Sequence, residues 1–182
     1  IPISGFRRNL MDIYSNSYSK KQGALRQSFN TIIQGGSAVI SQLSIINIDK
    51  ALRNSNYNAS LVGTVHDSIT LSCAHDDVDE VITMAKNIME NLPLDIFQVN
   101  YKGKKIHFPM EAEADVGSSY AYEFSYDKDD FYSFKSTKGF TDYYKKIKKL
   151  EDMEESGLID KDKLSLLIER FSKEKPKYQS VS

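Results

Sequence analysis

The feature that most restricts the fold is a long segment without proline, from Lys20 to about Asn54. Its apolar side chains recur at intervals of three and four residues, which predicts one long helix. They are Leu25, Phe29, Ile32, Ile33, Val39, Leu43 and Ile46. Adjacent glycines weaken a helix interior, so any bend is expected at Gly35-Gly36. An Asn-rich stretch at residues 54–58 ends the helix.

Two short runs rich in β-branched residues follow, at 61–65 and 68–73, and only His66 and Asp67 separate them. This pattern predicts an antiparallel hairpin with the two residues at its tip. A two-residue hairpin loop requires positive φ, which aspartate tolerates better than most residues and histidine to a lesser degree. A carboxylate fixed there is a natural Mg²⁺ ligand. Taken alone, VHDS is better explained by an ordinary turn.

The next segments alternate between helix and strand patterns. Residues 76–92 carry one apolar stripe at helical spacing, and Pro93 closes that helix. Residues 95–101 and 104–109 predict a second hairpin around Lys102-Gly103, and 111–116 continues extended. This order indicates an α+β fold with antiparallel strands.

The composition changes after about Asp127, so we expect one domain at 1–126 and a helical extension at 127–182. Residues 141–155 and 161–173 predict two amphipathic helices, and the final KEKPKYQSVS predicts a disordered tail. The extension contains a lysine run: Lys145, Lys146, Lys148 and Lys149. We interpret this run as a solvated helix face neutralised by nearby acids, with a phosphate-contacting patch as the alternative.

Composition narrows the function classes. A net charge of −1 and a pI of about 6.4 argue against a stand-alone nucleic-acid binder, which is usually basic. One cysteine excludes an internal disulfide, and three histidines make a structural zinc site unexpected. No signal peptide is present, and uninterrupted apolar runs are too short to span a membrane, so we expect a cytoplasmic protein without a membrane role. The first residue is Ile1, which is typical of a start within a longer reading frame, an artificial boundary or a processed product.

Arg26, Asn30 and Gln34 are spaced four residues apart and therefore form one polar ridge on the long helix. A guanidinium can bind a phosphate or a base edge, and carboxamides can donate to the minor-groove acceptors that every base pair presents. Taken alone, the ridge favours a solvent-exposed polar face with a small-residue packing patch, and a surface that binds duplex DNA is the alternative.

The sequence RQSFNTIIQGGSAVI at 26–40, followed by VGTVHDSITL at 62–71, resembles the family A DNA polymerases, the group of bacterial DNA polymerase I and related phage enzymes. In that family, R-x3-N-x3-Q-G precedes a strand that ends in V-H-D. GFRRNLMDIYS at 5–15 is similar to the family's G-R-R-x-L-P-D-I-x-S stretch. PLDI at 93–96 and ADVGSSY at 114–120 are similar to its closing segments, so the resemblance covers residues 5–122.

The resemblance implies that the chain is the C-terminal part of the polymerase palm. Asp67 would bind the two Mg²⁺ ions of the nucleotidyl-transfer site, and His66 would touch the primer terminus. The polar ridge would line the minor groove of the template-primer DNA. Arg7 or Arg8 would approach the DNA backbone, and a dNTP would bind in the complete enzyme.

The chain departs from the family pattern in several ways. Ser68 stands where many members carry Glu, and residues 101–109 look like an inserted hairpin, which favours a phage enzyme acting in the host cytoplasm. We find neither the second metal-binding Asp of a D-Y-S-like strand nor the fingers helix of R-x3-K-x6-Y-G type. The isolated chain is therefore expected to be inactive without the N-terminal remainder of the polymerase. The extension after Asp127 lies outside the resemblance.

Two other function classes remain open. A non-catalytic DNA- or replisome-binding module that retains the palm shape is favoured by Ser68 and by the near-neutral charge. A metal-dependent nuclease would use His66 and Asp67, but it needs a second convergent acid. The nearest acids alternate as they would along an exposed strand edge: Glu111, Glu113 and Asp115.

Overall fold

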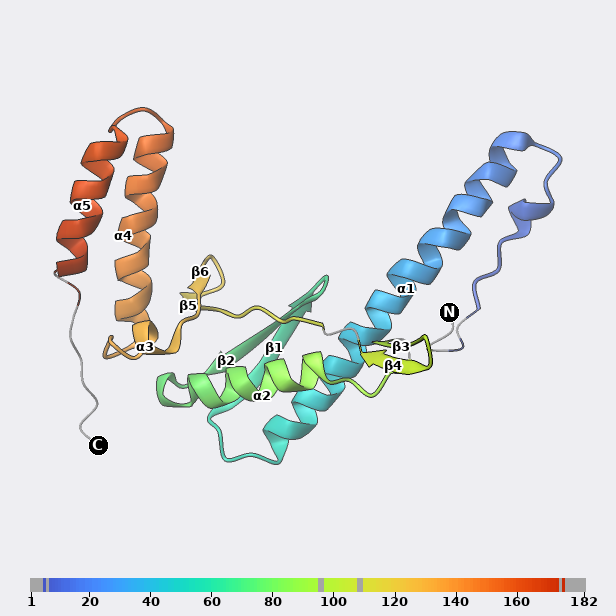
Figure 1. Ribbon diagram of the computed structural model, residues 1–182, viewed down its shortest axis with the longest axis horizontal. Helices are drawn as coiled ribbons and strands as arrows, with labels where there is room; N and C mark the ends of the chain where they lie inside the picture. The colour runs from blue at the N-terminus through green and yellow to red at the C-terminus, as the bar shows by residue number, and fades with distance from the viewer. Residues whose placement is uncertain (1–4, 6, 95–96, 108–109, 174, 176–182) are drawn as a thin grey trace. The chain divides into compact units, whose positions relative to one another are not determined.

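The computed structural model describes residues 5, 7–94, 97–107, 110–173 and 175. The chain divides into two compact units, Ile1–Ala112 (unit 1) and Glu113–Ser182 (unit 2), which are drawn in Figure 1. Helices and antiparallel hairpins make up both units, which confirms the α+β class. The strands form three separate two-stranded sheets among the described residues, rather than one continuous sheet.

Unit 1 is organised along the long helix α1, Tyr18–Arg53, which a short 3-10 helix, η1 (Met11–Tyr14), precedes. The prediction from the apolar spacing is confirmed. Gly35 and Gly36 do not interrupt the helix.

The hairpin of β1 (Ala59–Val65) and β2 (Ser68–Cys73) follows α1, and α2 (Val78–Glu90) comes after a 3-10 turn, η2 (His75–Asp77). Figure 1 shows α2 and this hairpin beside the C-terminal half of α1. A buried cluster holds the three elements together: Ile48 and Leu52 of α1 and Val81 of α2, with Ile69, Leu71 and Cys73 of β2 packed against it. Burial of this apolar surface is what fixes the hairpin to the helix.

Two hydrogen bonds between side-chain carboxylates and backbone N–H groups link distant parts of unit 1. The Asp77 carboxylate accepts from the Asn58 backbone N–H at 2.8 Å, which ties the base of the hairpin to the start of α2. The Glu90 carboxylate accepts from the Ala112 N–H at 3.0 Å, which ties the end of α2 to the end of the unit.

The second hairpin is also confirmed, as β3 (Gln98–Tyr101) and β4 (Lys104–His107). Lys102 and Gly103 form its turn with φ of 49° and 76°, the positive values that a tight hairpin requires. The parts of its predicted strands at 95–96 and 108–109 lie outside the described residues.

Unit 2 contains the β5–β6 hairpin (Asp115–Ser119 and Tyr122–Ser125), α3 (Lys128–Phe131), α4 (Thr137–Glu155) and α5 (Lys161–Lys173). Both predicted helices are confirmed. Helix α4 begins four residues earlier than expected, because Ser136 caps it by accepting from the Gly139 N–H at 3.2 Å. The strand β6 and the short helix α3 were not predicted. Glu174 and residues 176–182 of the expected tail lie outside the described residues.

The core of unit 2 is aromatic. Phe131, Phe134 and Phe140 are almost completely buried, and Phe140 meets each of the other two rings edge to face. Thr141 is also buried. Its hydroxyl accepts from the Ser118 N–H and donates to the Thr137 carbonyl, each at 2.8 Å, and so joins β5 to α4.

The packing boundary between Ala112 and Glu113 precedes the change in composition near Asp127 from which we inferred two domains. Packing places the β5–β6 hairpin with the helical extension, whereas the sequence resemblance places most of it with the polymerase segment. These are different properties of the chain, so the boundary of the related segment stays a prediction.

By length and composition, α1 is apolar enough to cross a membrane, contrary to our expectation from uninterrupted apolar runs. The helix reaches this mean hydropathy because no charged residue lies at 27–48, whereas its uninterrupted apolar runs are short, as expected. The apolar window of α1 is 17% buried in the described residues, and Ile48 and Leu52 at the C-terminal end of the helix pack in the unit 1 cluster.

Candidate functional site

The candidate site is the turn at the tip of the β1–β2 hairpin. Val65 and Ser68 form the last pair of the ladder, so His66 and Asp67 are the two loop residues, as predicted. His66 takes the positive φ, at 56°, and Asp67 does not. Both side chains are exposed, and neither forms a hydrogen bond or ion pair within the described part of the chain. The turn therefore presents a free imidazole and a free carboxylate.

A hydrogen bond from a side chain to the backbone stabilises the turn. The Ser68 hydroxyl donates to the Val65 carbonyl oxygen at 2.8 Å across the loop. A positive φ at a residue other than glycine is uncommon, so a bond that fixes the flanking pair restricts a strained conformation. Ser68, a departure from the family pattern, thus has a structural role.

A β-bulge in β1 sets the register that creates this tip. Leu61 pairs with Leu71, whereas Gly63 pairs with Thr70, so Val62 is one extra residue on the β1 side. If the strands paired without a bulge, Val62 would pair with Thr70, the pairing would shift by one, and Val65 would become part of a three-residue loop. The bulge therefore decides that His66 and Asp67 alone occupy the turn.

The end of the hairpin opposite the turn packs in the core of unit 1. Cys73 at the end of β2 packs there, and its burial, together with Asp77 and Glu80, raises the pKa of its thiol to about 11. The thiol is thus protonated at neutral pH and a poor nucleophile. Cys73 is a packing residue, and the chemically able groups of the hairpin are those at its tip.

The polar ridge of Arg26, Asn30 and Gln34 is exposed on the N-terminal half of α1, as predicted. In Figure 1 the hairpin tip points toward this half of the helix. Arg8 lies against this half of α1, because its guanidinium donates a hydrogen bond to the Thr31 hydroxyl at 3.1 Å. Thr31 in turn donates to the Gln27 carbonyl at 2.6 Å, which fixes the hydroxyl. Arg7 is exposed.

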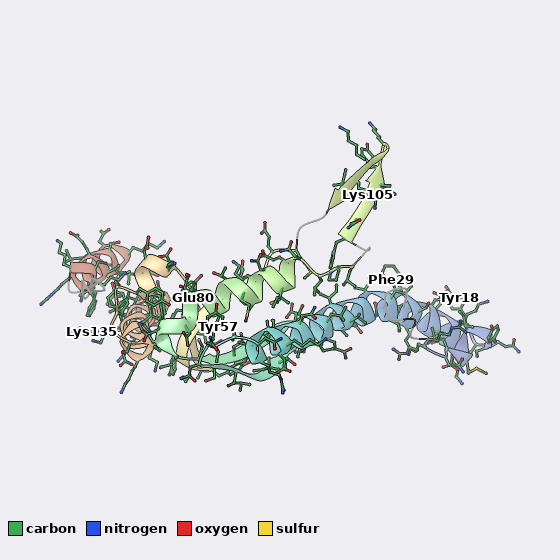
Figure 2. All side chains as sticks on the ribbon, turned by 90° about the horizontal axis from the view of Figure 1, so that it is seen from below. Tyr18, Phe29, Tyr57, Glu80, Lys105 and Lys135 are labelled. Carbon is green, nitrogen blue, oxygen red and sulfur yellow. The ribbon has the colours of Figure 1, made fainter. Side chains whose placement is uncertain are left out.

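The rows of side chains beside the ridge on the same helical half are apolar and uncovered. Leu25, Phe29, Ile32 and Ile33 are 43%, 66%, 53% and 56% exposed. Figure 2 shows Phe29 on a stretch of α1 that lies beyond α2. Exposed apolar side chains grouped in this way are typical of a contact surface.

The residues at the tip fit a divalent cation only in part. The Asp67 carboxylate is a hard oxygen donor with no competing partner in the described residues, which suits Mg²⁺. The described residues contain no group of three or more His, Cys, Asp or Glu side chains that could hold a metal. Glu111, Glu113 and Asp115 are all exposed. Asp67 can therefore supply one ligand of a metal site, and the other protein ligands must come from outside these residues.

Two features of the site were not predicted from the sequence. The Val62 bulge has no local sequence signal other than the glycine that follows it, and a glycine inside a strand does suggest a bulge. The contact between Arg8 and Thr31 joins residues 23 positions apart, which no periodicity reveals.

The model of DNA polymerase family A matches residues 2–122 of this chain. A DNA polymerase of Bacillus phage SP01 is 36% identical over 160 residues, which are 88% of this chain and 17% of that protein. DNA polymerase I of Lactococcus lactis strain IL1403 is 34% identical over 88 residues, 48% of this chain and 10% of that protein.

Among solved structures, the POL domain of Pol1 from M. smegmatis, in complex with DNA primer-template and dNTP, matches 49% of this chain and 16% of that chain. The TM-score is 0.46 and the identity 28%. This chain thus spans about a sixth or less of each relative's length.

The phage match reaches beyond the family segment. Because it leaves only 22 of the 182 residues outside it, it includes residues 23–160 wherever it begins. It therefore takes in α4 of unit 2, which the family match at 2–122 does not reach. The family match covers about two thirds of the chain, and on this basis the chain belongs to DNA polymerase family A.

Proposed function

We propose that this chain supplies the C-terminal part of the palm of a DNA-directed DNA polymerase. The observation that carries the proposal is the tip of the β1–β2 hairpin, where His66 and Asp67 are exposed and unpartnered in the described residues while the hairpin is anchored in the core. In a chain of this polymerase family, such a tip is suited to face the end of a primer.

Asp67 is the proposed ligand for Mg²⁺, which when bound would activate the primer 3′-hydroxyl and stabilise the departing pyrophosphate. One carboxylate lacks the charge to hold two such ions, so a second carboxylate must come from the N-terminal remainder of the polymerase. His66 contacts the primer terminus, and the Ser68–Val65 bond keeps the turn in place. The isolated chain is accordingly inactive.

The polar ridge is the proposed surface for the nascent duplex. Arg26 would bind a phosphate or a base edge, and the amides of Asn30 and Gln34 would donate to acceptors in the minor groove. Arg8, held by Thr31, and Arg7 would contact the DNA backbone. The whole-chain charge of −1 is compatible with this role, because the contacts are local.

The second candidate is a non-catalytic module that binds duplex DNA through the same ridge. It is favoured by the single carboxylate at the tip and by Ser68, whose hydroxyl is engaged in the turn. This candidate predicts DNA affinity that does not depend on Asp67 in any assembly.

Fluorescence anisotropy with a labelled primer-template duplex tests the ridge. Arg26→Ala should weaken binding and reduce the salt dependence by about one counterion. Gln34→Ala should weaken binding by about three- to tenfold at fixed salt, through loss of one groove contact. Gln42→Ala, an exposed glutamine about two turns further along the same helix than Gln34, is the matched control. Equal affinities for all three variants and the wild type would remove the ridge from the interface.

A further inference from the structure

Unit 2 holds a lysine ammonium group among aromatic rings. Lys175 lies just past α5, and its ammonium forms an ion pair with the Asp130 carboxylate oxygen Oδ1. The same nitrogen is 5.5 Å from the ring centroid of Phe134 and 5.9 Å from that of Tyr143. These distances are within the range of cation–π attraction. The Asp130 carboxylate and two rings thus lie against the ammonium, and the negative charge of Asp127 also acts on it.

The carboxylate has one oxygen available for this cation. The Tyr144 hydroxyl donates to Oδ2 of Asp130. Oδ1 is buried and forms no other hydrogen bond in the described part of the chain, so the ammonium of Lys175 is its partner. A buried carboxylate oxygen without a partner is costly. Loss of the ammonium would therefore leave an unpaired charge inside unit 2.

The aromatic rings beside the ammonium are positioned by contacts that do not involve Lys175. Phe134 is 2% exposed and packs edge to face on Phe140, with centroids 5.6 Å apart. Tyr143 packs on Phe134 at 5.4 Å and on Tyr144 at 5.2 Å. Because α3, α4 and their connection supply all of these rings, the surroundings of the cation do not depend on the chain after α5.

We propose that Asp130, Phe134, Tyr143 and Tyr144 form a binding site for a primary alkylammonium group, and that Lys175 fills it as an intramolecular ligand. The site holds Lys175 against α3 and α4. It does not depend on the polymerase role proposed for unit 1.

The hydrogen-bond geometry restricts the ligand class. A guanidinium binds a carboxylate best through two parallel bonds, and Tyr144 already occupies one of the two oxygens. A quaternary ammonium has no N–H to donate to the buried Oδ1. A primary ammonium can donate to one oxygen while its charge lies near the rings, so the site should prefer lysine-like amines over both.

Hydrogen exchange on the full chain tests the proposal, with peptides from α4 as the reporter and peptides from α2 in unit 1 as the internal reference. Lys175→Ala should accelerate exchange in α4 by about tenfold and leave α2 unchanged. n-Propylammonium replaces the deleted atoms, and at tens of millimolar, the range expected for so small a ligand, it should restore slow exchange. 1-Propanol, propylguanidinium and tetramethylammonium, at matched ionic strength, should restore much less.

Two further variants keep the test decisive if Lys175→Ala loosens unit 2 extensively. Lys175→Met retains the length of the side chain without the charge and should also accelerate exchange in α4. Asp130→Asn preserves the shape of the carboxylate and should abolish the preference for the amine over the alcohol. Unchanged exchange in both Lys175 variants, equal rescue by 1-propanol, or no rescue by n-propylammonium would each overturn the proposal.

Discussion

The hydroxyl of Ser68 donates to the carbonyl oxygen of Val65 at 2.8 Å, across the turn that carries His66 and Asp67. The same two residues are the last pair of the β1–β2 ladder. The loop is therefore closed by the ladder and by a side chain at once. In this protein, the residue directly after the candidate metal ligand holds the turn that presents it.

Ser68→Ala should loosen the tip without unfolding unit 1. The lost hydrogen bond is exposed, so we expect a cost of about 1 kcal/mol, confined to the turn. Faster amide exchange at residues 65–69, with α2 unchanged, would show it. Ser68→Thr retains the hydroxyl and should behave as the wild type. Identical exchange in the Ala and Thr variants would contradict a bracing role.

Arg8→Ala and Thr31→Val should weaken duplex binding through one shared contact. Arg8 would meet the DNA backbone, and Thr31 only positions it, so we expect the larger loss for Arg8→Ala, with a salt dependence reduced by about one counterion. Thr31→Val keeps the shape and removes the acceptor.

The double variant supplies the control for this pair. If Thr31 acts only through Arg8, the double variant should bind like Arg8→Ala alone. Additive losses, measured by anisotropy across a salt series, would show that Thr31 acts independently of Arg8.

Ser44→Ala should stabilise unit 1. Ser44 is 1% exposed in α1, and its hydroxyl has no hydrogen-bond partner in the described residues. Removing an unsatisfied buried hydroxyl should raise the free energy of unfolding by about 1 kcal/mol, with a further small gain in helix propensity.

Ser41→Ala is the matched control for Ser44, because the Ser41 hydroxyl donates to the Ser37 carbonyl at 3.2 Å in the same helix. It should give the propensity gain less the loss of that hydrogen bond, and therefore a smaller gain than Ser44→Ala. Chemical denaturation followed by circular dichroism compares the two. A Ser44 variant that is less stable than the wild type would reveal a partner for that hydroxyl.

Gly117→Ala should disrupt the β5–β6 hairpin. A Cβ at Gly117 would lie 1.8 Å from the Tyr122 carbonyl oxygen, a backbone atom that cannot move aside without breaking the hairpin. We expect unit 2 to lose about 3 kcal/mol, at the upper end of the range for overpacking. Gly139→Ala in α4 is the control, since its Cβ would meet the Ser136 hydroxyl at an ordinary 3.6 Å. Equal melting temperatures would contradict the close approach.

The sequence predicted most elements of both units because their signals are local. The spacing of Leu25, Phe29 and Ile32 suffices for a helix, and two β-branched runs around His66-Asp67 suffice for a hairpin. Features that depend on contacts between distant parts of the chain could not be predicted from the sequence. The register of the hairpin depends on the Val62 bulge, which only pairing with the other strand reveals.

The site was partly predictable for the same reason. The polar ridge lies on one continuous helix, so its exposure follows from spacing alone. The Arg8–Thr31 contact and the pairing of β5 with β6 depend on the path of the chain, which composition does not encode. The proposed mechanism also needs a second carboxylate, which we expect on another polypeptide, so its test requires that polypeptide.

The central claim is that Asp67 is half of a nucleotidyl-transfer site. The most direct measurement is primer extension with Mg²⁺ and four dNTPs, with this chain alone and mixed with a polypeptide that carries the fingers and the other carboxylate strand. Asp67→Asn, of the same shape, is the comparison, and Asp76→Asn, an exposed acid outside the turn, is the control. The account predicts extension only in the mixture, retained by Asp76→Asn and lost with Asp67→Asn. Extension that survives Asp67→Asn would contradict it.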